Sequence, residues 1–305
     1  MPKAYVFTEY GGAETQSFVD LPKPAPGPSE LLVAVHAAGV NPVDWKFRAG
    51  YLRDFVPLQL PAVFGSEISG VVEQLGDGVD GFAIGDEVFG NPVSGGYAEY
   101  ALLPVAAAAR KPAGVSFADA ATLPVAAATA YDGVHQLDLR SGQVLLVNGV
   151  GGGIGVAAAQ IARALGLVVI GTASAEKREF VESLGVTHVT YGDGVAERIR
   201  AVAPGGVDAI YDLVGGDALR SVAGLVEDSS KLITSADPAT ASEYGGNPVA
   251  RARNSRVLEA VASLVESGAL DPVVTSVLPF DRAGDALALV ETGHARGKVV
   301  LEMPR

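Results

Sequence analysis

A cluster of glycines beside two apolar runs constrains this chain more than any other feature of its sequence. Residues 149–155 hold five glycines, at the end of an apolar run over 143–149 and before a helical pattern over 154–166. A second apolar run, 167–173, follows at once. A strand, a glycine turn, a helix and another strand are typical of one unit of a parallel sheet with helices on its faces.

The glycine turn is suited to binding an anion. Free N–H groups and the helix dipole favour a phosphate at a helix start, and glycines permit a tight turn and a close approach of the backbone. The strict G-x-G-x-x-G spacing is not met, because Ile154 stands at its last position. We predict that Gly152, Gly153 and Ile154 contact the pyrophosphate of a dinucleotide. The alternative is that the glycines only let a buried helix pack closely on a strand.

The end of the second strand bears on which dinucleotide binds. Sites specific for NAD usually carry an Asp or Glu there, which binds the ribose 2′-hydroxyl. Here Ser174 stands at the turn, Glu176 falls at the start of the next helix, and Lys177 and Arg178 follow. A hydroxyl followed by positive charge suits a 2′-phosphate, so we predict NADPH as the cofactor, in contact with Ser174 and Lys177. The alternative is that Lys177 and Arg178 belong to the solvated face of an exposed helix.

The first third of the chain and its middle differ in pattern. Up to about residue 117, strand-like runs alternate with turns, which predicts a compact β-rich domain. Beyond that point helices and strands alternate, which predicts a parallel sheet. The expected strands are 187–191, 207–215 and 230–236, and the expected helices are 176–185, 195–203, 217–226 and about 250–267. The tail, 276–303, has the pattern strand, helix, strand and is expected to return to the first domain.

Composition excludes several classes of function. The net charge of −13 repels a phosphate backbone, so nucleic acid is not an expected partner. The chain has no cysteine, which excludes disulfides, thiolate catalysis and cysteine-ligated metals. We expect the four histidines, His36, His135, His188 and His294, to be surface or structural residues. No apolar run reaches the roughly 18–20 residues that span a bilayer, and no signal-peptide pattern is present, so we expect a cytoplasmic protein without a membrane partner.

Several short motifs occur in a fixed order along the chain. They are AAGVNPVDWKFRAG at 37–50, GSEISGVVEQLGDGV at 65–79, GDEVFG at 85–90, GGYAEY at 95–100, LPVAAATAYDGV at 123–134 and GKVVLEM at 297–303. Together with the glycine segment, they resemble the medium-chain dehydrogenase/reductase superfamily. The branch they resemble most is that of the zinc-free NADPH:quinone oxidoreductases related to zeta-crystallin, and the resemblance covers essentially the whole chain.

The resemblance implies an α/β protein with two domains. A GroES-like, β-rich catalytic domain is expected at 1–117, completed by 269–305, and a Rossmann domain with a doubly wound parallel sheet that binds NADP(H) is expected at 118–268. The active site is expected in the cleft between them, and a homodimer is implied. Zinc-dependent relatives carry a cysteine where this chain has Asn41, and a Gly-His-Glu motif where it has Gly65-Ser66-Glu67. We therefore expect no metal.

The same resemblance assigns the remaining candidate site residues. Asn41 and Thr129 are expected near the nicotinamide, and Asn41, Asp44 and Tyr51 in the substrate pocket. Asp44 either contacts substrate or fixes its own loop, and Tyr51 either offers a phenol donor or anchors a loop. Further cofactor contacts are expected from Tyr191, Val214, Gly215, Ser235 and Lys298. Lys298 is expected near the phosphates, the alternative being a simple strand-edge lysine.

These expectations predict an oxidoreductase in which NADPH delivers a hydride to a quinone or an α,β-unsaturated carbonyl compound without a metal. One alternative is a zinc-independent alcohol or aldehyde oxidoreductase. Another is an NADPH-binding protein with a regulatory or structural role, because an intact cofactor site does not by itself establish catalysis. The sequence identifies neither the physiological acceptor nor the proton donor.

Overall fold

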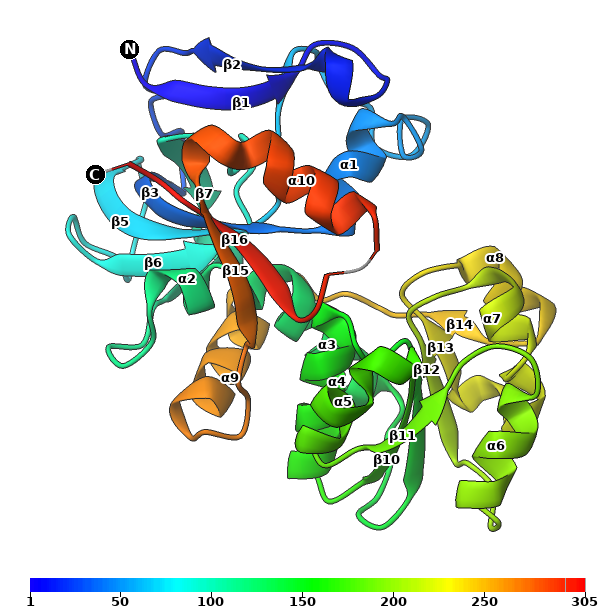
Figure 1. Cartoon of the computed structure of the whole chain (residues 1–305). Coiled ribbons are helices and arrows are strands. Elements are labelled where there is room, and N and C mark those ends of the chain that lie inside the picture. Colours follow the sequence, from blue (N-terminus) through cyan, green and yellow to red (C-terminus); the bar gives the residue numbers. More distant parts are fainter. Residues whose placement is uncertain (294, 305) are drawn as a thin grey trace. The chain divides into compact units, whose positions relative to one another are not determined.

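A computed structural model describes residues 1–293 and 295–304 of the chain (Figure 1). His294, one of the histidines considered above, lies outside the described residues. The contacts divide the chain into two compact units. Unit 1 comprises Met1–Val125, Arg253–Glu266 and Val273–Arg305, and unit 2 comprises Ala126–Ala252 and Ser267–Pro272. The sequence-based domain limits at 117 and 268 stay a prediction.

Unit 1 is built from two β-sheets. The smaller has the strand order β2-β1-β4, and the larger has the order β15-β16-β3-β5-β6-β8, with β7 also paired to β3. The strands are β1 (Lys3–Phe7), β2 (Gln16–Asp20), β3 (Glu30–Val40), β4 (Ala62–Val63), β5 (Ile68–Leu75), β6 (Glu87–Gly90), β7 (Tyr100–Pro104), β8 (Ala108–Arg110), β15 (Val274–Pro279) and β16 (Lys298–Glu302). Because β16 pairs antiparallel with β3, the C-terminal strand joins a sheet formed by the first part of the chain.

The helices of unit 1 are α1 (Pro42–Arg48), α2 (Phe117–Ala120), α9 (Ser255–Glu266) and α10 (Ala283–Glu291). The buried residues of α10 are Ala283, Ala286, Leu287 and Val290, whose spacing places them on one face of the helix. That face packs into the core of unit 1 together with Phe280, Val299 and Leu301. Burial of this apolar stripe explains why the tail segment is helical.

Unit 2 is a parallel sheet with the strand order β11-β10-β9-β12-β13-β14. Its strands are β9 (Val144–Asn148), β10 (Val168–Ala173), β11 (Thr187–Thr190), β12 (Ala209–Asp212), β13 (Leu232–Thr234) and β14 (Asn247–Pro248). The helices are α3 (Ala128–Gln136), α4 (Gly153–Ala164), α5 (Arg178–Ser183), α6 (Val195–Val202), α7 (Gly216–Arg220) and α8 (Pro238–Glu243). The strand order reverses between β9 and β12, and ligands of such sheets bind at the carboxyl ends of the strands at this point.

Three segments differ from the sequence-based expectation. The helix expected at 217–226 is α7, which ends at Arg220, followed by a separate short helix, Ala223–Leu225. The helix expected from about 250 begins at Ser255, because Asn254 Oδ1 accepts a hydrogen bond from the Val257 N–H. Residues 237–249, for which no element was predicted from the sequence, contain α8 and β14. Asp237 caps α8 by accepting from the Thr240 N–H, and Pro238 follows it.

Candidate cofactor and active site

The glycine segment joins β9 to α4. Gly149 takes a φ of +94°, a backbone conformation that favours glycine, and Gly152 is the residue that caps α4. A Cβ on Gly155 would lie 2.6 Å from the carbonyl oxygen of Gly149, so this glycine lets the helix approach the loop. A Cβ on Gly152 would meet no described atom within 4 Å. Packing therefore explains Gly155 but not Gly152, whereas a ligand that approaches the start of α4 would explain Gly152.

A row of buried polar side chains links the strand ends from which the loops of unit 2 leave. Thr172 on β10 donates from Oγ1 to Asn148 Oδ1 on β9, at 2.7 Å. The Asn148 amide donates to Asp212 Oδ1 on β12 at 2.8 Å, and Thr234 Oγ1 on β13 donates to Asp212 Oδ2 at 2.7 Å. Four neighbouring strands are thus joined at one edge of the sheet by side chains that are all buried.

The same row anchors the loops. The Gly149 N–H donates to Thr172 Oγ1 at 3.0 Å, and the Gly215 N–H donates to the Asp212 carboxylate at 3.1 Å. The Ala236 N–H donates to Thr234 Oγ1 at 3.0 Å. These four polar residues were not among the site residues predicted from the sequence. The signal that could have found them is a polar side chain at the end of each apolar strand.

The turn after β10 brings Lys177 to the glycine loop. Ser174 precedes a short helix, Ala175–Lys177, and its side chain makes no capping hydrogen bond. Lys177 Nζ lies 3.4 Å from the carbonyl oxygen of Gly151, and a Cβ on Gly151 would lie 2.8 Å from Lys177 Cδ. Arg178 instead forms an exposed ion pair with Glu182, one helical turn away. The alternative that these residues belong to the solvated face of an exposed helix therefore holds for Arg178, whereas the Lys177 side chain lies at the glycine loop.

The other predicted cofactor contacts in unit 2 divide into exposed and buried residues. Tyr191 and Val214 are 59% and 52% exposed, which leaves them accessible to a ligand. Gly215 follows Val214 with a φ of +80°, and a Cβ there would lie 2.5 Å from Asp237 Cβ. The fold itself therefore requires glycine at position 215, whether or not a ligand binds there.

Thr129 and Ser235, which were predicted separately from the sequence, are brought together by Tyr211. The buried hydroxyl of Tyr211 lies 3.1 Å from the Thr129 carbonyl oxygen and 3.0 Å from Ser235 Oγ. Burial raises the pKa of Tyr211, so the phenol stays protonated. Gly133 makes room for the ring, since a Cβ there would lie 2.6–2.7 Å from Tyr211 atoms. No sequence motif indicated Tyr211.

In unit 1, Asp44 fixes the loop that carries Asn41. Asp44 Oδ2 accepts from the Asn41 N–H at 2.9 Å and from the Tyr97 hydroxyl at 2.9 Å, and Oδ1 accepts from Ser66 Oγ at 3.2 Å. Burial raises the pKa of the Asp44 carboxyl to about 6, although the bonds from Asn41 and Tyr97 lower it. All these partners belong to the protein, and Asp44 is buried. This geometry favours the loop-fixing role over contact with substrate.

Lys298 has different contacts from those expected of it. Its Nζ donates to Asn41 Oδ1 at 2.6 Å and to Glu67 Oε1 at 2.8 Å, and the side chain is buried. The Asn41 amide also donates to Glu67 Oε1 at 2.7 Å, while Glu67 Oε2 accepts from the Val125 N–H at 2.7 Å. These contacts favour a role within unit 1 over the expected contact with the phosphates, which stays a prediction. Lys298 and Glu67 orient Asn41.

The side chains at the positions of the family's zinc ligands do not fit zinc. Protein zinc sites use thiolate, imidazole and carboxylate ligands, whereas Asn41 and Ser66 offer an amide and a hydroxyl. The carboxylate of the neighbouring Glu67 is bound by the Lys298 ammonium. Within residues 1–293 and 295–304, no group of three or more His, Cys, Asp or Glu side chains is arranged to hold a metal ion.

Tyr51 lies after α1 and is 67% exposed, with its ring edge-on to that of Trp45 at 5.9 Å between centroids. The exposed hydroxyl can reach a ligand, and the ring contact is what a loop anchor makes. Both roles proposed from the sequence therefore stay open for this residue.

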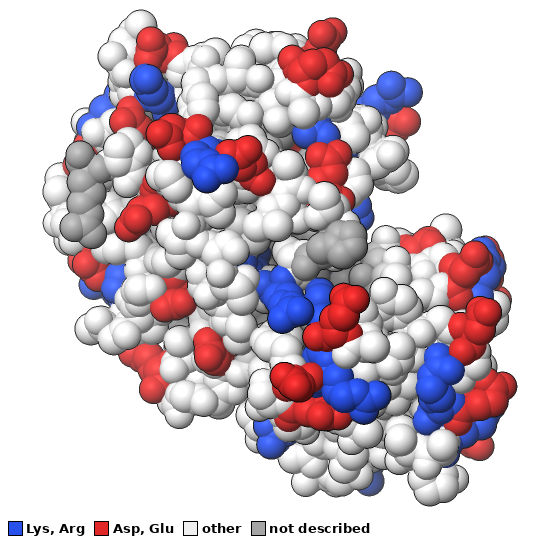
Figure 2. Space-filling model, in the orientation of Figure 1, with Lys and Arg blue, Asp and Glu red and all other residues white. Residues whose placement is uncertain are grey.

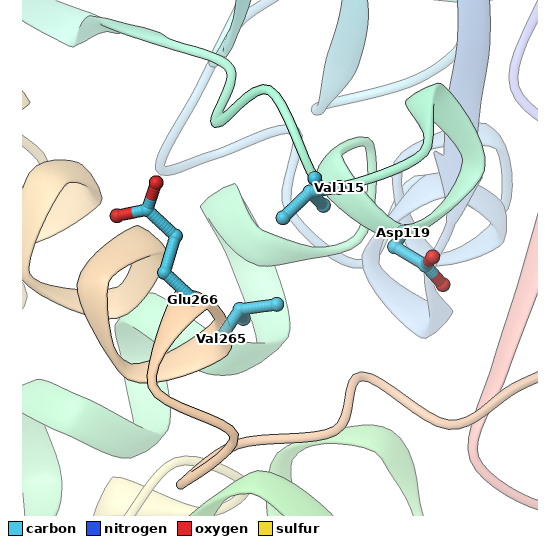
Figure 3. A pocket seen from close by; sticks show the side chains of 5 residues that line it. Val115, Asp119, Val265 and Glu266 are labelled. Atoms are coloured by element: carbon cyan, nitrogen blue, oxygen red, sulfur yellow. The ribbon is translucent and has the colours of Figure 1, made fainter.

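A pocket of about 360 Å³ in unit 1 lies apart from all these residues. Figure 3 shows residues that line it, Val115 and Asp119 from the segment that begins α2, and Val265 and Glu266 from the end of α9. None of the predicted site residues lines this pocket.

On the face shown in Figure 2, acidic and basic side chains are intermixed and much of the surface is uncharged. No helix among the described residues has both the length and the apolar character needed to cross a membrane.

Comparison with known proteins now identifies the family. Residues 27–113 match the family described as alcohol dehydrogenase GroES-like domain, and residues 184–301 match the family described as zinc-binding dehydrogenase. Human quinone oxidoreductase is 30% identical, over 96% of this chain and 95% of that protein. This chain belongs to the medium-chain dehydrogenase/reductase superfamily. The predicted fold class, an α/β protein with a GroES-like domain and a Rossmann-type parallel sheet, is confirmed.

Other relatives also match over the length of the chain. The chloroplastic NADPH-dependent alkenal/one oxidoreductase of Arabidopsis thaliana is 32% identical, over 98% of this chain and 79% of that protein. The solved structure of the quinone oxidoreductase from Coxiella burnetii has a TM-score of 0.89 and 29% identity, and 99% of each chain is covered.

Two further solved structures differ in the cofactor that their descriptions name. A mycobacterial protein in complex with NADPH has a TM-score of 0.88 and 29% identity, over 99% of this chain and all of that one. A protein described as an NAD-dependent alcohol dehydrogenase has a TM-score of 0.88 and 33% identity, with the same coverage. Enzymes of this family bind nicotinamide cofactors. The choice between NADPH and NADH depends on the residues of this chain.

Proposed function

We propose that this protein is an oxidoreductase that uses NADPH to reduce a quinone or an α,β-unsaturated carbonyl compound. The observation that carries the proposal is similarity over nearly the whole chain to proteins named quinone oxidoreductase and NADPH-dependent alkenal/one oxidoreductase. The geometry of unit 2 supports it, because Gly152 leaves open space at the start of α4, where a pyrophosphate can accept backbone hydrogen bonds.

The proposed cofactor site is formed by loops at the carboxyl edge of the sheet of unit 2. The side chains of Thr172, Asn148, Asp212 and Thr234 hold these loops in place, and they do so in part by binding the backbone N–H of the proposed contact residue Gly215. We propose that the contacts come from Thr129, Gly152, Gly153, Ile154, Ser174, Lys177, Tyr191, Val214, Gly215 and Ser235. Asn41, oriented by Lys298 and Glu67, is proposed to contribute from unit 1.

The preference for NADPH over NADH rests on the turn after β10. Within this turn, residues 174–177, the acidic residue is Glu176, whose side chain is exposed, while the Lys177 ammonium lies at the glycine loop. A lysine at this position attracts the 2′-phosphate, and the Ser174 hydroxyl can donate to it. An Asp or Glu at the strand end would instead favour the free 2′-hydroxyl of NADH.

Bound NADPH would supply the hydride, and the acceptor must also gain a proton. The residues of this chain bind and orient the reactants, and the donor set at Asn41, Ser66 and Glu67 supports a reaction without zinc. Tyr51 is the proposed phenol donor toward substrate, since its side chain is exposed. Asp44 is not proposed to contact substrate, because its carboxylate is occupied by Asn41, Tyr97 and Ser66.

A second candidate function is the oxidation of an alcohol or the reduction of an aldehyde without zinc. It is favoured by the structural similarity to the NAD-dependent alcohol dehydrogenase, which has the highest sequence identity of the solved structures described above. The lack of suitable zinc ligands disfavours it, because alcohol oxidation in this superfamily would otherwise rely on a Lewis acid.

Steady-state kinetics with defined acceptors test the proposal. Purified protein is mixed with NADPH or NADH and a panel of quinones, enones and simple aldehydes, and separately with NADP⁺ or NAD⁺ and a panel of alcohols. We expect NADPH oxidation with quinones or enones and none with simple aldehydes. Turnover of alcohols with NAD would support the second candidate. Tight binding of NADPH with no turnover of any acceptor would indicate a regulatory or structural role instead.

Three further properties are also proposals. They are a homodimer, a cytoplasmic location, and domain limits at 1–117 with 269–305 and at 118–268. Sedimentation of the full chain tests the first, and limited proteolysis tests the third.

A further inference from the structure

His188 is a buried polar residue for which the sequence predicted only a surface or structural role. It lies on β11, where it pairs in register with Gly171 of β10, and its side chain is 7% exposed. Its Nε2 lies 3.1 Å from the carbonyl oxygen of Ser174. Because a carbonyl only accepts hydrogen bonds, Nε2 carries the proton and donates it. Among the described residues, Nδ1 has no hydrogen-bond partner. The contact with Ser174 is therefore the one hydrogen bond found for this imidazole.

The Ser174 carbonyl is the point at which the turn after β10 is fixed. The same oxygen accepts from the backbone N–H of Lys177 at 3.1 Å, the bond that closes the short helix Ala175–Lys177. A carbonyl oxygen has two lone pairs, so His188 and Lys177 together use both. The imidazole on β11 therefore holds the Ser174 carbonyl oxygen in place. Because this oxygen also binds the Lys177 N–H, it determines the position from which the Lys177 side chain extends to the glycine loop.

We propose that His188 is a positioning residue for recognition of the 2′-phosphate, and so determines specificity for NADPH over NADH. The inference rests on the proposed function, since it assigns to Ser174 and Lys177 the contact with this phosphate. His188 acts through the Ser174 backbone carbonyl, and the Ser174 side chain makes no capping hydrogen bond. A Leu or Phe would fill the same buried space, but neither could hold the carbonyl.

A matched pair of amides separates the hydrogen bond from packing. In His188→Gln the amide nitrogen stands at about the position of Nε2 and can donate to Ser174, whereas in His188→Asn the shorter chain places it near Nδ1. Val189→Ala is the control. It removes buried volume from the next residue of β11, which is 4% exposed and belongs to the core of unit 2.

The measurement is the dissociation constant of NADPH and of NADH, by fluorescence titration of the full chain, with circular dichroism to verify the fold of each variant. We expect His188→Asn to weaken NADPH binding by about 3- to 10-fold, the range for loss of one hydrogen bond, and to leave NADH binding within about twofold. His188→Gln should retain the wild-type ratio of the two constants, and Val189→Ala should also retain it.

Two results would overturn the inference alone. In one, the wild type prefers NADPH and His188→Asn keeps the same ratio. In the other, Val189→Ala changes the ratio as much as His188→Asn does, which would mean that any loosening of β11 is sufficient. If the wild type binds NADH more tightly, the proposed cofactor is wrong, and this inference with it. Should His188→Asn fail to fold, a changed ratio in the folded His188→Gln protein would equally count against the inference.

Discussion

The ammonium nitrogen of Lys298 lies 2.8 Å from Oε1 of Glu67, although 231 residues separate the two in the chain. The Glu67 side chain is completely buried, and that of Lys298 is 5% exposed. A buried ion pair adds little net stability, because desolvation of the charges offsets their attraction. It does fix geometry, and here both partners hold the Asn41 amide.

Loss of the Lys298 charge should be costly to the fold. We expect Lys298→Met to lower the free energy of unfolding by about 3–5 kcal/mol, because it leaves the Glu67 carboxylate buried without a counter-charge. The double variant Lys298→Met/Glu67→Gln should recover most of this loss, because no charge is then buried. Urea denaturation of the three proteins checks this. A single variant as stable as the wild type would show that the pair is dispensable.

Asp44 should make stability depend on pH. Burial raises the pKa of Asp44 from 3.8 to about 6, so the folded state holds this proton more tightly than the unfolded state. The resulting stabilisation is complete below pH 3.8 and is lost as the pH rises to about 6, by up to about 3 kcal/mol for two pKa units.

The variant Asp44→Asn isolates this effect. It removes the titrating group, and its amide can accept from Asn41 and Tyr97 and donate to Ser66. The difference in unfolding free energy between wild type and Asp44→Asn should therefore shift in favour of the variant between about pH 4 and pH 6. A difference that stays constant over this range would contradict the raised pKa.

Gly152 and Gly155 should respond differently to a methyl group. Gly152→Ala should change the free energy of unfolding by less than about 1 kcal/mol, the cost of a poorer helix cap, because its Cβ meets open space. It should nevertheless weaken NADPH binding by at least about tenfold, because the methyl group keeps the pyrophosphate from the backbone. Gly155→Ala should destabilise the fold by about 1–3 kcal/mol through overpacking. Thermal unfolding and cofactor titration separate the two. Unchanged NADPH binding by Gly152→Ala would argue against a ligand at Gly152.

Lys177 should discriminate between the cofactors. We expect Lys177→Ala to weaken NADPH binding by about 10- to 100-fold, the value of a charge-assisted hydrogen bond, with NADH binding nearly unchanged. Ser174→Asp should go further, because a carboxylate repels the 2′-phosphate and accepts from a 2′-hydroxyl. Titration of both cofactors against wild type and the two variants measures this. If Lys177→Ala weakens both cofactors equally, the assignment of the 2′-phosphate to this turn is wrong.

Zinc should be unnecessary for activity. Because Asn41 and Ser66 are poor zinc ligands, we expect no stoichiometric zinc in the purified protein and no loss of NADPH oxidation after treatment with a chelator. A measurement of bound metal and a rate measurement before and after chelation provide the test. One tightly bound zinc ion per chain would refute the proposed metal-free reaction.

The path of the chain in unit 2 could be predicted to a large extent from its sequence. Local information is sufficient there, because an apolar strand, the glycine turn at 149–155 and the helix that follows are contiguous. The Ser174–Lys177 turn could be located in the same way, by its distance from the glycines. Helix α8 could not be predicted with the same ease. The capping pair Asp237 and Pro238 is visible in the sequence, but no clear apolar periodicity follows it.

The polar row in unit 2 could be predicted from the sequence only in part. Asn148, Thr172, Asp212 and Thr234 each lie at or near the end of an apolar strand, so the sequence shows their individual positions. Their joining depends on the strand order β10-β9-β12-β13, which brings the four strand ends together at one sheet edge. The sequence alone predicts a parallel sheet but does not identify these hydrogen-bonded neighbours.

By itself, the sequence determined the alternation of elements, the glycine turn and the residue types at the positions of the family's zinc ligands, because each of these depends on residues close together in the chain. Only the tertiary structure decided that Lys298 meets Glu67, that Tyr211 joins Thr129 to Ser235, and that His188 holds Ser174. These contacts link separate strands and loops, and a buried polar group takes whichever partner the fold brings within hydrogen-bond distance. That partner is set by strand order and register, which no short stretch of sequence encodes.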